Sequence, residues 1–224
     1  MFDDLRNSFD FFVKNKIRFS RKNFVEKNPQ RIERNRFENL YTKNFLEKFI
    51  EKRELNSAKI LDIGCKNWFY ARGEYDFFKS FCKTITLDGV EIDAHRLYSN
   101  FYSRYETSKY YTKGLENVHY IVGNLLDVRG EYDFIVWSLP FVSIYPHMSW
   151  GLPKKYFMPE KLLMHAFSLL NDNGQMLIIN QGEAEAEIQR DLFRKLDIKF
   201  EEKGLVPNEY VQYAHNRYAF LVKK

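Results

Sequence analysis

The stretch Lys59-Ile60-Leu61-Asp62-Ile63-Gly64-Cys65 decides the fold of this chain. Its apolar, β-favouring residues surround a single acid, which predicts a buried strand at residues 59–63. Asp62 must find a hydrogen-bond partner there, because an unpaired carboxylate in a core is costly. Gly64 follows directly and lets the backbone turn tightly beside a ligand. The strand is therefore expected to end in a turn of the kind found at nucleotide sites.

Strand-like and helix-like patterns alternate along the rest of the chain. The expected strands cover residues 59–63, 84–92, 118–122, 132–137, 175–180, 198–201 and 217–222. The expected helices cover residues 37–54, 70–82, 94–113, 159–170 and 183–196, and a turn is expected at residues 171–174. This alternation predicts an α/β fold with a doubly wound, mostly parallel seven-stranded sheet, closed by an antiparallel pair of C-terminal strands. Ligands of such sheets lie at the carboxyl ends of the strands, where the strand order reverses.

The N-terminal segment carries the whole net charge. Residues 1–58 hold 14 Lys and Arg against 9 Asp and Glu, whereas residues 59–224 hold 21 of each. We therefore divide the chain into a basic, aromatic N-terminal arm at residues 1–36, built of short helices, and a domain at residues 37–224, whose first helix is expected to pack on the sheet edge. Such an arm attracts an anionic partner, either a phosphate backbone or an acidic surface. The alternative is a solvated segment that contacts nothing in particular.

Composition excludes several classes of protein. A hydrophobic content of 45% with 17% aromatic residues is too high for a disordered chain. No apolar run approaches the roughly 18 residues of a membrane helix, and the start of the chain is acidic where a signal peptide is basic, so a cytoplasmic location without a membrane partner is expected. Cys65 and Cys82 are too few for a disulfide framework, and without a Cys/His cluster no metal site is expected.

Three further motifs follow the ends of expected strands. They are Gly89-Val90-Glu91-Ile92-Asp93, Gly123-Asn124-Leu125 and Ser138-Leu139-Pro140-Phe141. Glu91 ends its strand 27 residues after Gly64, and a carboxylate in that place can accept hydrogen bonds from the hydroxyls of a ribose. The segment 138–159 is rich in proline and must be largely irregular. Because long loops at strand ends are usually functional, we expect it to be a substrate lid.

With these motifs in order behind the Asp62-Ile63-Gly64 turn, residues 40–224 resemble the class I S-adenosylmethionine-dependent methyltransferases. The resemblance implies a Rossmann-like methyltransferase fold, S-adenosylmethionine as the cofactor, Glu91 at its ribose and Asn124 at its adenine. The implied cofactor site comprises Asp62, Gly64, Cys65, Lys66, Glu91, Ile92, Asn124, Leu125 and Ser138. Lys66 and Trp68 stand where the family prefers glycine, so the loop is expected to depart from the usual backbone path.

The acceptor side is expected after the fourth strand. Ser138-Leu139-Pro140-Phe141 resembles the Asn/Asp/Ser-Pro-Pro-Phe/Tyr motif of amino-group methyltransferases, with Leu139 in place of the first proline. The catalytic candidates are Ser138, Phe141 and His147, and the candidates for substrate contact are Pro140, Trp150, Asn180 and Glu183. His147 or Glu183 could take a proton from an alcohol acceptor, although each is otherwise a structural or exposed residue. Since methyl transfer needs no metal, positioning is expected to dominate.

The acceptor itself is not readable from the sequence. A small molecule is expected rather than RNA, because no known RNA-binding module is appended. The basic arm nevertheless leaves RNA as an alternative acceptor. The alternative is that the protein is a non-catalytic module, which keeps the fold and binds a nucleotide or a partner. A nicotinamide dehydrogenase ranks third, since no intact Gly-x-Gly-x-x-Gly follows the first strand.

Overall fold

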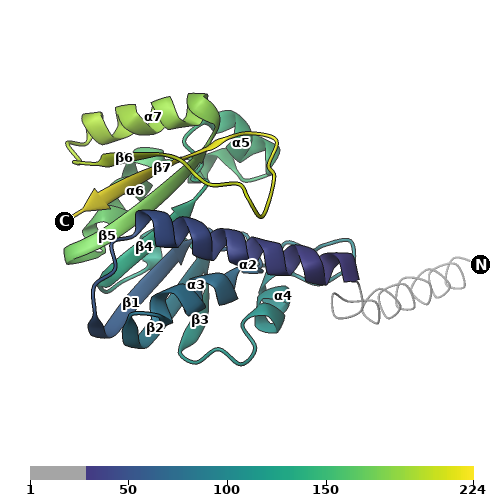
Figure 1. The fold of residues 1–224 in the computed structure, drawn as a ribbon. Coiled ribbons are helices and arrows are strands. Elements are labelled where there is room, and N and C mark those ends of the chain that lie inside the picture. Colours follow the sequence, from purple (N-terminus) through teal and green to yellow (C-terminus); the bar gives the residue numbers. More distant parts are fainter. Residues whose placement is uncertain (1–28) are drawn as a thin grey trace, which may run out of the picture.

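The computed structural model describes residues 29–224, shown as a ribbon in Figure 1. Most of the expected arm therefore lies outside the described residues. Helix α2 (Pro29–Phe49) begins eight residues earlier than the sequence pattern indicated, with a proline in its first turn, and ends before residue 54. The division of the chain at residue 36 stays a prediction, and it falls within this continuous helix.

A seven-stranded sheet forms the centre of the molecule, in the order β3-β2-β1-β4-β5-β7-β6. The strands are β1 (Leu55–Ile63), β2 (Cys82–Glu91), β3 (Val118–Val122), β4 (Tyr132–Ser138), β5 (Leu170–Gln181), β6 (Glu201–Leu205) and β7 (Arg217–Lys223). Strands β1 to β5 run parallel, and β7 lies antiparallel to both β5 and β6. The α/β class, the mostly parallel seven-stranded sheet and its antiparallel closing pair are confirmed. The strand order reverses between β1 and β4, which makes their carboxyl ends the expected place for a ligand.

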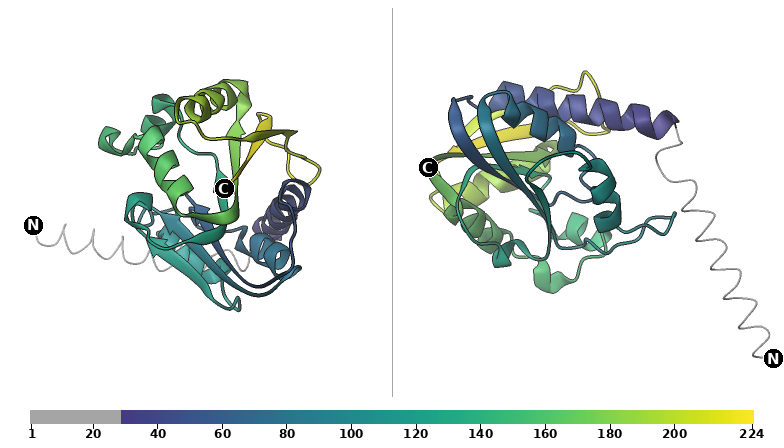
Figure 2. Two further views of the ribbon diagram at one scale, coloured as in Figure 1. Left: turned by 90° about the vertical axis from the view of Figure 1, so that its left-hand side faces the viewer. Right: turned by 90° about the horizontal axis from the view of Figure 1, so that it is seen from below.

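Helices cover both faces of this sheet, as Figures 1 and 2 show. One face packs against α2 and α3 (Ala71–Lys79), and the other against α6 (Pro159–Ser168) and α7 (Gly182–Lys195). Tyr41, Phe45 and Phe49 of α2 are buried in one core cluster with Phe134 of β4. The expectation that this helix packs on the sheet edge is therefore wrong, since it lies on a face beside α3.

The long helix expected at residues 94–113 is replaced by an irregular segment and the short helix α4 (Arg104–Tyr111). A capping box fixes where the helix starts: the Ser103 side chain accepts from the Glu106 N–H, and the Glu106 carboxylate accepts from the Ser103 N–H at 2.9 Å. The segment 138–159 also contains a short helix, α5 (Ile144–Ser149), and a 3₁₀ turn (Lys154–Tyr156).

Two features of the C-terminal half differ from expectation. Residues 171–174 do not end the preceding helix in a turn but lie inside β5, where Tyr132 pairs with Leu170 and Phe134 with Gln175. The extra residues form a bulge, in which Asn173 takes a φ of 64°. Strand β6 begins at Glu201 instead of ending there.

Among residues 29–224, no helix is both long and apolar enough to cross a membrane.

Candidate active site at the carboxyl ends of the strands

A cavity of about 380 Å³ lies at the carboxyl ends of β1 to β4. Its wall is formed by the turns after these strands, by part of the 138–159 segment and by α7. The cavity thus occupies the place where the strand order reverses, and its volume is in the range of small-molecule sites.

The turn after β1 begins with Gly64, which takes a φ of 75° and donates its N–H to the Val90 carbonyl at 2.8 Å. Lys66 and Trp68 take φ values of 55° and 51°, so the two residues at the family's glycine positions are left-handed. Both residues thus adopt a backbone conformation that glycine takes readily, and the expected departure from the family's backbone path stays a prediction. The cost is about 1 kcal/mol for each, which the surrounding contacts must offset.

The side chain of Trp68 points away from the cavity. It is fully buried, and its indole N–H donates to the Glu74 carboxylate at 2.9 Å. Its ring fills the space beside Gly89, where a Cβ would come within 2.7 Å. A bulky residue at a glycine position therefore becomes part of the core and leaves the cavity open.

Glu91 is buried at the end of β2 and lines the cavity. One carboxylate oxygen accepts from the Lys66 N–H at 2.9 Å. The other accepts from the Asp93 N–H at 2.7 Å and from Nη1 of the buried Arg104 at 3.1 Å. The side chain is thus held in one orientation before any ligand arrives. Sequence reasoning missed Arg104, whose place at the start of α4 followed from the overlooked capping box.

The turn after β3 brings Asn124 and Leu125 to the cavity, and Ile92 joins them from the end of β2. The Asn124 side-chain oxygen accepts from the Leu126 N–H at 3.0 Å, which caps the 3₁₀ turn Leu125–Asp127. The oxygen keeps a second lone pair for a ligand. Together the three residues offer one polar group between two apolar ones.

Asp62 and Cys65, both expected at the cofactor, are fully buried and do not line the cavity. Asp62 accepts from the Tyr70 hydroxyl at 3.0 Å, and its other oxygen has no partner among the described residues. Burial raises the pKa of Asp62 to about 7, and burial likewise raises the pKa of the Cys65 thiol. These two side chains therefore belong to the buried core next to the β1 turn.

The expected acceptor-side residues Ser138, Pro140, Phe141, His147 and Trp150 all line the cavity. His147 is buried, and its Nε2 lies 3.0 Å from the Pro153 carbonyl. Because a carbonyl only accepts, Nε2 must carry a proton, and in the neutral ring Nδ1 is the atom that can accept one. The ring centroid of His147 lies 5.5 Å from that of Phe141.

Trp150 closes the cavity on the side of the β1 turn. Its ring lies 4.5 Å from the Lys66 ammonium and 5.4 Å from the Arg104 guanidinium, which are cation–π distances. Its carbonyl accepts a hydrogen bond from Arg96. Trp150, from the 138–159 segment, therefore covers the charged groups at this end of the cavity.

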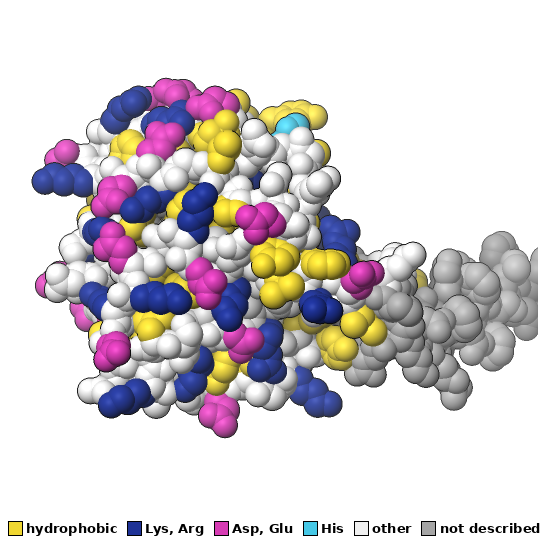
Figure 3. Space-filling model, in the orientation of Figure 1, with side chains coloured by type: hydrophobic (Ala, Val, Ile, Leu, Met, Phe, Trp, Pro, Cys, Tyr) yellow, Lys and Arg dark blue, Asp and Glu magenta, His cyan; other side chains and the backbone are white. Residues whose placement is uncertain are grey.

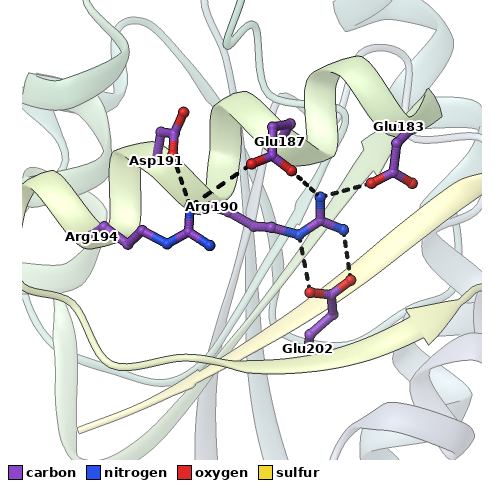
Figure 4. A network of polar contacts seen from close by, with 6 residues as sticks. All are labelled: Glu183, Glu187, Arg190, Asp191, Arg194 and Glu202. Carbon is purple, nitrogen blue, oxygen red and sulfur yellow. Dashed lines mark hydrogen bonds and ion pairs between the residues drawn. The ribbon is translucent and has the colours of Figure 1, made fainter.

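The remaining two expected residues lie outside the cavity wall. Asn180 is fully buried near the end of β5, and neither polar atom of its side chain has a partner among the described residues. Glu183 is exposed on α7 and pairs with Arg190 at 2.7 Å, in the network of Figure 4. Arg190 also forms two parallel hydrogen bonds with Glu202 of β6, at 3.0 and 2.7 Å. Glu183 therefore takes part in the ion-pair network that joins α7 to β6, and its contact with a substrate stays a prediction.

Helix α7 instead presents Glu185, Gln189 and Leu192 to the cavity, together with Gln181 just before it. Sequence reasoning missed Glu185 and Gln189. Their spacing of four residues places them on one face of a helix, three positions before a buried leucine, and that was the available signal.

The chain is similar in fold to several solved structures. A methyltransferase from Clostridium acetobutylicum described as S-adenosylmethionine-dependent matches with a TM-score of 0.56 and 10% identity over 82% of this chain and 91% of that one. A SAM-dependent methyltransferase from Aquifex aeolicus matches with a TM-score of 0.54 and 15% identity over 92% and 96%. The chain has the class I methyltransferase fold.

A third methyltransferase-fold match differs in length. TrmN from Thermus thermophilus matches with a TM-score of 0.53 and 12% identity over 82% of this chain, which spans only 48% of TrmN. No protein-family model matches the chain, and no curated protein matches it. The likeness therefore concerns the fold, and the chemistry has to be argued from the site.

Proposed function

We propose that the protein is an S-adenosylmethionine-dependent methyltransferase. The observation that carries the proposal is the buried Glu91 carboxylate, held at the end of β2 on the wall of the cavity. A carboxylate in this place is the group that α/β folds use for the hydroxyls of a ribose. The Gly64 turn lies on the adjacent strand β1, where the resemblance places the methionine part of the cofactor.

The residues present fit this cofactor. Three donors already bind Glu91, and a carboxylate offers about four lone-pair sites, so one remains for a ribose hydroxyl. Ile92 and Leu125 provide apolar surface for a base. The Lys66 ammonium faces the Trp150 ring and is placed to pair with an amino-acid carboxylate. When bound, the cofactor supplies a methyl group on a positively charged sulfur.

The chain's own task is then to hold the acceptor and to exclude water. Ser138 and Phe141 lie at the end of β4, where they can orient an acceptor group. The lid residues His147 and Trp150 shield it from solvent. If the acceptor carries a proton that must leave, Nδ1 of His147 is the candidate base, since Nε2 is engaged with a carbonyl.

Calorimetry with S-adenosylhomocysteine tests this proposal. We expect binding to the wild type and a loss of about tenfold in affinity for Glu91→Gln, which keeps the shape of the side chain but removes its charge. Glu116→Gln, an exposed acid next to the start of β3, is the matched control and should bind like the wild type. Thermal melting checks that both variants fold. Absence of heat with the wild type at millimolar ligand would remove the proposal.

One observation favours the alternative of a non-catalytic module. Arg104 already pairs with Glu91, and Trp150 covers both Lys66 and Arg104. If a ligand cannot displace these contacts, the cavity cannot admit the cofactor. If the protein is a non-catalytic module, we expect no binding of S-adenosylhomocysteine. If it is an enzyme, we expect binding, and Trp150→Ala should tighten that binding or leave it unchanged.

The acceptor is proposed to be a small molecule. Acidic and basic side chains are intermixed over the face shown in Figure 3, with no extended basic surface. The basic arm remains the candidate contact for RNA. Deletion of residues 1–28 leaves α2 intact, so a salt-sensitive gel shift with RNA that vanishes on this deletion would instead favour a nucleic-acid acceptor.

A further inference from the structure

Two polar residues on α7 face the cavity one helical turn apart. We propose that Glu185 and Gln189 form the polar end of the acceptor site and select a planar, uncharged small molecule with an amide-like edge, whose carbonyl accepts from Gln189 while its N–H donates to Glu185. This inference rests on the proposed function for the assignment of the cavity to an acceptor.

Gln189 provides the strongest observation. Its side chain is 2% exposed and lines the cavity, yet its amide nitrogen has no hydrogen-bond partner among the described residues. Buried donors are almost always satisfied, so a ligand that offers an acceptor atom would satisfy this amide once the side chain turns toward the cavity.

Glu185 supplies the complementary group. One of its oxygens accepts from the Gln181 N–H at 3.0 Å, and lone pairs remain for a ligand N–H. Partial burial raises the pKa of this carboxyl. A ligand amide therefore finds an acceptor at Glu185 and a donor at Gln189 on the same face of one helix.

The distribution of charge disfavours an anionic acceptor at the α7 end of the cavity. Among the described residues that line the cavity, the Lys and Arg side chains are Lys66 and Arg104, which belong to the β1 turn and α4. Arg190 follows Gln189 directly but turns to the outer side of α7, where three glutamates bind it (Figure 4). A phosphate or carboxylate at the α7 end would thus face Glu185 without a compensating cation.

Aromatic side chains line part of the cavity, beside aliphatic ones such as Leu152 and Leu162. Phe141, Tyr156 and Phe157 line the cavity, and the ring centroid of Phe157 lies 5.5 Å from that of His147. Flat walls of this kind suit a planar ring, since aromatic side chains pack favourably on its face or edge. Shape and charge therefore agree on the same class of compound.

Benzamide and benzoate test the inference, because they share size and shape but differ in charge and in the N–H donor. Their affinities are measured by ligand-observed NMR, with and without S-adenosylhomocysteine. We expect benzamide to bind about tenfold more tightly than benzoate. Gln189→Met, similar in length but without the amide, should weaken benzamide, and Glu185→Gln should raise the affinity for benzoate. Glu187→Gln, on the outer side of α7, should change neither.

Equal or tighter binding of benzoate, or no benzamide binding at millimolar concentration, overturns the inference. So does benzamide binding that is unchanged in a folded Gln189→Met protein. Displacement of benzamide by an oligoribonucleotide overturns the assignment to a small molecule. The two proposals can fail separately. If the wild type does not bind S-adenosylhomocysteine but still prefers benzamide to benzoate, only the methyltransferase proposal is contradicted. If it binds S-adenosylhomocysteine but does not prefer benzamide, only the proposed acceptor class is contradicted.

Discussion

At the scale of single residues, Trp68 of the β1 turn packs closely against Gly89 of β2. A Cβ on Gly89 would lie 2.7 Å from the indole ring, which is fully buried and cannot move freely. We therefore expect Gly89→Ala to lower the free energy of unfolding by about 1–3 kcal/mol, measured by urea denaturation.

The same contact provides its own control. Trp68→Phe removes the part of the ring nearest to Gly89, so the cost of Gly89→Ala should be smaller in that background. An equal cost in both backgrounds would show that the clash is not with this ring.

Asp62 predicts how stability depends on pH. Burial raises its pKa to about 7, whereas a carboxyl in the unfolded chain titrates near about 3.9. The folded state therefore binds the proton more tightly, and the free energy of unfolding falls as the pH rises from about 4 to about 7. Asp62→Asn cannot ionise, so its stability should exceed that of the wild type by an amount that grows over this range. Denaturation at a series of pH values measures it, and a difference that is constant with pH would be incompatible with this explanation.

At the scale of elements, α2 is expected to be an integral layer of the fold. Phe45 is 3% exposed within the core on one face of the sheet, whereas Phe37 of the same helix is 37% exposed. We expect Phe45→Ala to lower the free energy of unfolding by about 3–5 kcal/mol and Phe37→Ala by less than about 1 kcal/mol. Similar costs for the two variants in urea denaturation would mean that α2 does not pack on the sheet as described.

The sequence predicted the elements better than their boundaries. The strand at residues 118–122 was predicted with its observed bounds, because polar segments on both sides delimit it. The helix at residues 94–113 was overestimated, although Ser103 and Glu106 carried the signal for its true start. The left-handed conformation of Lys66 and Trp68 was not predictable, since tertiary contacts there override a local preference against it.

Residues that line the cavity were predictable where they follow strands and not where they lie on a helix. Glu91, Asn124 and Ser138 reach the cavity because parallel strands end at one edge of the sheet. On α7, Glu183 was chosen and Glu185 was not. Residues two positions apart in a helix point in directions that differ by more than half a turn. Only the packing of α7 therefore determines which glutamate faces the cavity.

At the scale of the whole molecule, the account depends on how the sheet order gathers the site. The reversal between β1 and β4 leaves one cavity at the ends of four parallel strands, with Glu91 at one end and the α7 pair at the other. The 138–159 segment also lines this cavity and carries Phe141, Trp150 and Phe157. Cofactor and acceptor would thus be held in one enclosure by elements far apart in the sequence.

The central claim is that an adenosine-containing cofactor lies across the ends of β1 to β3 with its ribose at Glu91. A crystal structure of the protein grown with S-adenosylhomocysteine tests this most directly. We expect a ribose hydroxyl within hydrogen-bond distance of the Glu91 carboxylate and the base against Ile92 and Leu125. A ligand bound elsewhere, or a cavity without ligand and with the Glu91–Arg104 pair and Trp150 in place, would contradict the account.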